Sequence, residues 1–233
     1  MLVISLTTQL EEAIAAPGVK NASGNIRSFE EFLAPEALVQ LEKQHAGIFA
    51  FLAFHPRSDR VVTEYVKSGT LASDSGSRIL VLFTLDASAR FPSRIGHQSF
   101  QRWLDLDAEV HPAYQMVRER FLPERVPPLP GIILFGSFSV AAECLYVGLA
   151  DAEKPEDVRQ RLRQLFSLAE ESFLQKHSGE PGSWVGPLAV KCQGAGLSYI
   201  RSGSSSTREW LARAYRFLAE HKGDLVSVLS LFK

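Results

Sequence analysis

The sequence predicts an α/β protein built on one central mixed sheet flanked by helices. From residue 48 onward, short continuous apolar runs are bounded by turn residues, a pattern typical of strands buried on both faces. Between these runs, apolar residues recur at helical spacing, which predicts helices packed on the sheet. The length of 233 residues allows a sizeable core, with extensions at either end.

The charge balance argues against a partner that is recognised through a global field. Lys and Arg number 25 against 26 Asp and Glu, so nucleic acid, anionic lipid and strongly acidic ligands have no overall attraction to this chain. Basic residues are also not interleaved with strand aromatics, as an RNA-binding sheet would require. We therefore expect no nucleic-acid partner.

The compartment expected from the sequence is a reducing cytoplasm. The apolar run 2–6 has no basic residue before it and is soon followed by Glu11, which does not fit a signal peptide. The longest uncharged stretch, 126–142, contains three prolines and two glycines, so we expect no membrane span. The two cysteines, Cys144 and Cys192, have neither C-x-x-C nor zinc-site spacing and are interpreted as buried thiols of a soluble protein.

Residues 1–45 are expected to form an N-terminal helical extension. An amphipathic stretch at 9–16 is stopped by Pro17 and Gly18. Ser28 and Glu31 then have the spacing of a capping box, which predicts a second helical region over about 29–45.

The core is expected at 46–177 and begins with a βαβ unit. Apolar runs at 48–54 and 78–85 predict the two strands. Between them, Ser58 and Asp59 are candidate N-caps for a helix that Gly69 closes.

A helical insert at about 87–126 follows, with Trp103, Leu104, Tyr114, Val117 and Phe121 as its inward candidates. Strands at 131–138 and 143–149 are close enough in sequence to pair as an antiparallel hairpin. After Pro155, an apolar stripe predicts the last core helix, with inward residues Val158, Leu162, Leu165, Phe166, Ala169 and Phe173.

The segment Val-Pro-Pro-Leu-Pro-Gly-Ile-Ile-Leu-Phe at 126–135, together with the order strand, helix, strand, insert, strand, strand, helix, resembles the thioredoxin-like fold. The resemblance covers residues 48–175 and implies a cis bond before Pro130, directly ahead of the third core strand. Proline suits the first residue of a strand because it cannot donate to the ladder. In members of this superfamily, that backbone faces the active-site helix and binds extended substrate.

The position of the family's redox motif contains no sulfur in this chain. Thioredoxins place C-x-x-C at the start of the first core helix, whereas residues 55–60 here read His-Pro-Arg-Ser-Asp-Arg. Dithiol exchange therefore cannot occur at this position. The six histidines lack the spacing of a helical zinc site, and the sequence predicts no catalytic residue, metal or cofactor.

Two functions remain open from the sequence. The first is a non-catalytic protein-interaction or regulatory module that binds a protein or peptide by backbone pairing. Its candidate groove consists of Pro56, Arg57, Ser58, Asp59, Leu129, Pro130 and Gly131. The alternative is a glutathione-dependent transferase-like enzyme in which Ser58 supports the thiolate and Arg57 or Arg60 holds a carboxylate. Arg159, Arg161 and Arg163 form either a solvated helix face or a local anion patch.

Residues 178–233 are expected to form a Gly/Ser-rich hairpin followed by a helical extension. Gly194-Ala195-Gly196 lies between two apolar runs and is interpreted as the hairpin turn. Thr207 then caps a helix whose apolar side carries Trp210, Leu211 and Tyr215. This candidate interaction helix packs either on its own core or on a partner, including a second copy of the chain in a homo-oligomer.

Overall fold

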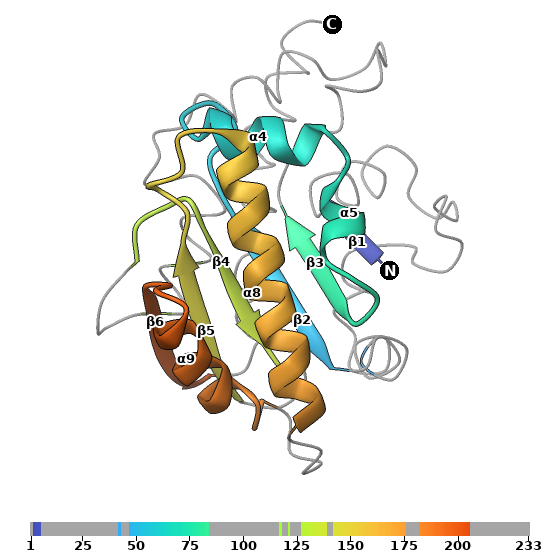
Figure 1. Ribbon diagram of the computed structural model, residues 1–233, viewed down its shortest axis with the longest axis vertical. Coiled ribbons are helices and arrows are strands. Elements are labelled where there is room, and N and C mark those ends of the chain that lie inside the picture. Colours follow the sequence, from blue (N-terminus) through green and yellow to red (C-terminus); the bar gives the residue numbers. More distant parts are fainter. Residues whose placement is uncertain are drawn as a thin grey trace, which may run out of the picture.

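The computed structural model describes residues 2–5, 42, 47–83, 117, 121, 127–138, 142–175 and 182–205 (Figure 1). The expected helices at 9–16 and from Thr207 onward, with Trp210, Leu211 and Tyr215, lie outside the described residues. So does most of the expected insert at 87–126. Within the described part, no helix is long and apolar enough to cross a membrane.

The described strands form one mixed sheet of six, in the order β1-β3-β2-β4-β5-β6. The strands β1, β3 and β2 are mutually parallel, and β4, β5 and β6 follow in antiparallel pairing. An α/β protein with a mixed sheet is therefore confirmed. The bounds are β1 Leu2–Ser5, β2 Ile48–Ala53, β3 Ile79–Phe83, β4 Gly131–Phe135, β5 Ala142–Gly148 and β6 Tyr199–Ser205.

Burial on both faces explains why the strands read as continuous apolar runs. Every residue of β2 is buried. Ala50 and Leu52 belong to the main core, whereas Phe49 and Phe51 alternate with them and so face the other side of the sheet. A strand covered on both faces cannot show the alternation of polar and apolar residues that marks a half-exposed strand.

Helices cover one face of the sheet, and Figure 1 shows α8 running across it with α9 beside β5 and β6. The bounds are α4 Arg60–Lys67, α5 Leu71–Asp74, α8 Pro155–Gln175 and α9 Val185–Gly194. Of the expected stripe on α8, all residues are buried except Phe173, which packs partly buried against the core. Gly69, at φ 78°, follows the end of α4 as predicted.

On the opposite face, an aromatic cluster packs against the sheet. The ring of Phe138 lies 4.4 Å from that of Phe49 and 5.1 Å from that of Phe135, between ring centroids. Val117 and Phe121 from the insert are both helical and buried, which confirms them as inward residues.

The expected hairpin in the C-terminal region is wrong. Residues 185–194 form helix α9, and β6 pairs with β5 instead of with a strand before the glycines. The reason is the spacing of the buried residues Val185, Leu188, Ala189 and Cys192, which matches a helix. Gly196, at φ 72°, ends the helix: its N–H bonds to the Gln193 carbonyl and the next N–H, of Leu197, bonds to Cys192.

The N-terminal extension also differs from a purely helical one, because Leu2–Ser5 form strand β1 at the edge of the sheet. The run contains two β-branched residues in four and pairs in parallel register with β3, from Leu2 opposite Leu80 to Ser5 opposite Phe83. Such a run is too short to be assigned from the sequence without its partner strand.

The position of Gly196 leads to a stability prediction. Replacing Gly196 with Ala should lower the free energy of unfolding by about 1–2 kcal/mol, because an L-residue is strained at positive φ. Space is not the cause, since a Cβ there meets nothing within 4 Å. Gly194→Ala is the matched control, which should stabilise the helix by up to about 1 kcal/mol. Chemical denaturation measures the free energy of unfolding of both variants. If Gly196→Ala and Gly194→Ala changed it equally and in the same direction, this role for Gly196 would be contradicted.

Candidate functional site

The loop between β2 and α4 lies at the same end of the sheet as the start of β4. Ala53, at the end of β2, pairs with Gly131, the first residue of β4. The Leu129–Pro130 peptide bond is cis, as predicted, and the Pro130 carbonyl accepts a 2.8 Å hydrogen bond from the Leu149 N–H. Both halves of the predicted groove are therefore at one end of the sheet.

His55 organises the loop. Its side chain is buried, and Nδ1 accepts the backbone N–H groups of Arg57 at 3.3 Å and Ser58 at 3.2 Å. An Nδ1 that accepts hydrogen bonds carries no proton. Two of the amides that precede α4 are thus directed to an imidazole of their own chain.

Asp59 closes the loop from the other side. Its Oδ2 accepts the His55 N–H at 2.6 Å, while its own N–H donates to the His55 carbonyl at 2.9 Å. Thr63 Oγ1 in α4 donates to the Pro56 carbonyl at 3.0 Å. Burial raises the pKa of Asp59 above 3.8, and the bond from the His55 N–H acts in the opposite direction.

Side-chain capping of α4 by Ser58 or Asp59 is therefore wrong. Asp59 occupies the N-cap position, but its side chain makes no capping hydrogen bond because its carboxylate is used by the His55 N–H. Ser58 is exposed and precedes the cap by one residue. The sequence spacing alone does not show whether the Asp59 carboxylate accepts an N–H of the helix or, as here, the N–H of the preceding His55.

Tyr146 on β5 supports the segment before β4. Its hydroxyl donates to the Pro128 carbonyl, and its ring edge packs against Phe121 at 5.8 Å between centroids. The Tyr146 ring lies over Gly131, where any Cβ would collide with the hydroxyl and the ring. Burial raises the pKa of Tyr146, and the negative charge of Asp59 raises it further, so the loop and this tyrosine are close enough to interact electrostatically.

The sequence analysis did not single out Tyr146. Its position in a buried strand concealed it among core residues, because a tyrosine with a satisfied hydroxyl is an ordinary core residue. The available signal was Gly131 at the start of a strand otherwise made of large apolar residues, since a glycine there indicates a close approach by another group.

An open surface borders the loop. Pro128 is exposed and Leu129 is half-exposed, and on the loop Arg57 and Ser58 are exposed beside half-buried Pro56. Among the described residues, no hydrogen bond engages the backbone N–H or C=O of Leu129. A donor and an acceptor on one residue can pair with an extended chain.

The two thiols lie away from this surface and apart from each other. Cys192 on α9 belongs to the core on the helical side, together with Leu145 and Val147 of β5. Cys144 alternates with these residues and therefore faces the other side of the sheet. Both are buried, and burial raises the pKa of Cys192 to about 11, which disfavours a reactive thiolate.

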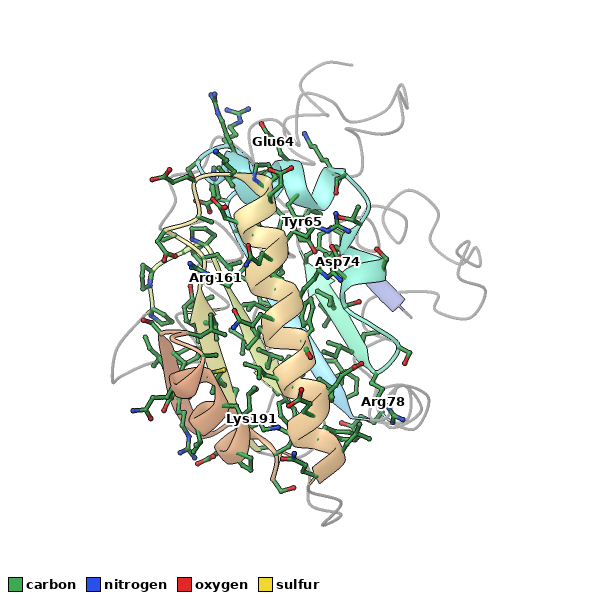
Figure 2. The ribbon with its side chains drawn as sticks, viewed as in Figure 1. Glu64, Tyr65, Asp74, Arg78, Arg161 and Lys191 are labelled. Atoms are coloured by element: carbon green, nitrogen blue, oxygen red, sulfur yellow. The ribbon has the colours of Figure 1, made fainter. Side chains whose placement is uncertain are left out.

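The arginines of α8 hold carboxylates of their own chain. Arg159 pairs with Asp74 through Nε at 2.9 Å, and the same carboxylate accepts a hydrogen bond from Tyr65 at 3.1 Å. Figure 2 shows Tyr65 and Asp74 between α4, α5 and α8. Arg161 makes a two-pronged contact with Asp151. Arg159 therefore links α8 to α5, and Arg161 links α8 to the connection that precedes it. Neither alternative from the sequence, a solvated helix face or an anion patch, includes these ion pairs.

Within the described ranges, no group of three or more His, Cys, Asp or Glu side chains is arranged to hold a metal ion. Comparison with protein-family models, with curated proteins and with solved structures found no match to this chain.

The contact between Tyr146 and Pro128 can be tested by removing one oxygen atom. Tyr146→Phe should lower the free energy of unfolding by about 1 kcal/mol, because the partly buried hydrogen bond to the Pro128 carbonyl is lost. Tyr199→Phe on β6 is the matched control and should change it by less than about 0.5 kcal/mol. Amide hydrogen exchange should increase at Leu149, whose N–H donates to the Pro130 carbonyl, in the first variant only. Equal stability of the two variants would contradict the supporting role.

The raised pKa of Asp59 predicts an unusual pH dependence. Because the folded-state pKa is raised above 3.8, the folded protein binds the proton more tightly, and deprotonation above that value costs stability. Asp59→Asn keeps an acceptor for the His55 N–H but cannot ionise. Its stability relative to the wild type should therefore improve from about pH 4 to about pH 7.

Asp151→Asn provides a control of opposite sign. Arg161 lowers the pKa of Asp151, so the ion pair contributes stability above the unfolded value of 3.8 that is lost as the pH falls through the folded value. This variant should be weakened more at neutral pH than in acid. Urea denaturation across the pH range measures both variants, and parallel profiles would show that Asp59 is not perturbed as described.

Proposed function

We propose that this chain is a non-catalytic protein-interaction or regulatory module on a redox-inactive scaffold of thioredoxin-like type. In this proposal, an extended segment of a partner protein docks beside Leu129, between the 127–131 segment and the 55–59 loop. The proposed compartment is the reducing cytoplasm, because cysteines there remain free thiols, as Cys144 and Cys192 are.

The order of elements supports the scaffold. The chain runs through β2, α4, β3, β4, β5 and α8, and the cis Leu129–Pro130 bond stands directly before β4. The strands β2 and β3 are parallel and β4 is antiparallel to β2, which brings the 55–59 loop next to that proline.

The observation that carries the docking proposal is the backbone of Leu129. Its donor and acceptor have no partner among the described residues, although the neighbouring Pro128 and Pro130 carbonyls are both engaged. Tyr146 and Leu149 make those neighbouring bonds and thereby hold Leu129 in a defined position. A preorganised donor and acceptor can add a strand without a large ordering cost.

The transferase-like alternative has less support from the geometry. A thiolate held at Ser58 would need the backbone amides at the start of the helix as well as the hydroxyl. The Arg57 and Ser58 N–H groups are directed to His55 Nδ1 instead. A glutathione matrix distinguishes the two functions: retention that Ser58→Ala abolishes would overturn the non-catalytic proposal.

Docking can be tested by blocking the surface without disturbing the core. The probe is a capped nonapeptide of alternating threonine and glutamine. Its binding is measured from the amide NMR shifts of the full chain. We expect saturable shifts at Leu129 that are lost in Ser58→Trp, because Ser58 is exposed and a bulky indole would cover the groove.

Ser77→Trp is the matched control for this experiment. Ser77 is also exposed, but it precedes β3 at the opposite end of the sheet. It should leave the shifts at Leu129 unchanged. If neither this peptide nor its charged analogues shift Leu129, the docking proposal is wrong.

A further inference from the structure

Strand β6 forms one edge of the sheet that the structure describes, and Figure 1 shows it there together with α9. Backbone groups that point outward from an edge strand can pair with a further strand. The register shows which residues these are. The Leu149 N–H bonds to the Pro130 carbonyl, and bonds between antiparallel strands recur at every second residue, so the odd-numbered residues of β5 bond to β4.

The even-numbered residues of β5 therefore bond to β6. Ile200 and Ser202 lie opposite two of them and carry the bonds to β5. Tyr199 and Arg201 alternate with these residues, so their N–H and C=O groups are directed away from the sheet. Within the part of the chain that the structure describes, no hydrogen bond engages these outward groups.

Helix α9 has an uncharged side at the same edge. It packs on β5 and β6, and α8 lies on its other side. Its single charged residue, Lys191, is directed toward α8, where the ammonium group bonds to Glu171 at 3.0 Å. Gln193 lies about 200° farther around the helix and so points away from α8, and Val190 beside it is 70% exposed. The outward groups of β6 are therefore next to an exposed helix side without charge.

We propose that this edge binds a second copy of the chain, through antiparallel pairing of the two β6 strands across a two-fold axis. The inference goes beyond docking at Leu129 and does not depend on it. A two-fold axis pairs β6 with the same strand of the other copy, so the residues of β6 must be complementary to one another.

The residues of β6 meet this requirement in one register. When Ile200 lies opposite Ile200 of the second copy, Tyr199 lies opposite Arg201, and these outward-facing residues exchange backbone hydrogen bonds. The two isoleucines then form an apolar pair, and each Tyr199 ring lies beside a guanidinium group, which is a favourable cross-strand pair. An axis through Arg201 would instead place two arginines opposite each other.

The charges at this edge favour a second copy over a charged partner. Lys191 is paired with Glu171, and Arg201 is paired with Glu143 of β5. Neither α9 nor β6 contains another charged residue, so a charged partner would find no unmatched charge on them. Two copies bring the same paired charges and the same uncharged helix side, so they meet without like-charge repulsion.

Analytical ultracentrifugation of the full-length chain from about 50 µM to about 1 mM tests for the dimer, because a short strand pair with one helix contact makes a small and weak interface. We expect the average mass to rise toward twice that of the monomer. Amide hydrogen exchange then locates the interface. Protection at Tyr199 and Arg201 should increase about five- to tenfold over this range, whereas Ile200 and Ser202 should already be protected at the lowest concentration.

Substitutions test the register. Ile200→Lys places two ammonium groups opposite each other and removes the apolar pair, so it should weaken the dimer about five- to tenfold. Leu174→Lys is the matched control, because Leu174 is also an exposed apolar residue but lies at the end of α8, and it should leave the dimer unchanged. Arg201→Pro removes an outward N–H without removing a bond to β5, so it should abolish the dimer while the chain stays folded.

Three results would overturn the proposal. The first is a monomer at every concentration. The second is a dimer in which exchange at Tyr199 and Arg201 does not depend on concentration, since its interface would lie elsewhere. The third is a shift of these two amides with the threonine–glutamine nonapeptide in a chain that stays monomeric, which would show that β6 pairs with a strand of another protein.

Discussion

The complete burial of β2 is the constraint on which the rest of the structure depends. A strand covered on both faces must hydrogen-bond on both edges, because an unpaired buried peptide group is costly. β2 satisfies this with β3 in parallel on one side and β4 in antiparallel on the other. The antiparallel pairing sets the start of β4 beside the end of β2. The two segments of the candidate groove therefore lie at one end of the sheet because β2 and β4 run in opposite directions.

Local hydrogen bonds then decide what this end of the sheet can do. Backbone groups of the 55–59 loop are used internally, by the His55 ring and by the Asp59 carboxylate. On the β4 side, Tyr146 and Leu149 engage the carbonyls of Pro128 and Pro130, and Leu129 between them retains its donor and acceptor. The described part of this site has few groups for chemistry and an unpaired backbone donor and acceptor at Leu129, and this is what supports the proposal of an extended partner.

Sequence reasoning succeeded where a local pattern had one interpretation. The apolar runs predicted β2 and β3, the stripe predicted α8, and the cis bond before Pro130 was predicted from a short motif. It failed where two structures share a pattern. Gly196 fits a hairpin turn and a helix end equally well, because both need positive φ. A Ser-Asp pair before a helix suits capping, but the Asp59 side chain turned back to His55.

By itself, the sequence determined the α/β class, the buried strands and the absence of sulfur at the helix start, since these depend on residue type and short-range spacing. Only the tertiary structure decided that α9 and β6 extend the sheet beyond β5, because pairing partners are chosen by contacts between distant segments. It also decided that Tyr146 covers Gly131 and bonds to Pro128. The Tyr146 side chain reaches a neighbouring segment, and such a contact produces no periodic pattern in the sequence. The role of Tyr146 could therefore be found only from the tertiary structure.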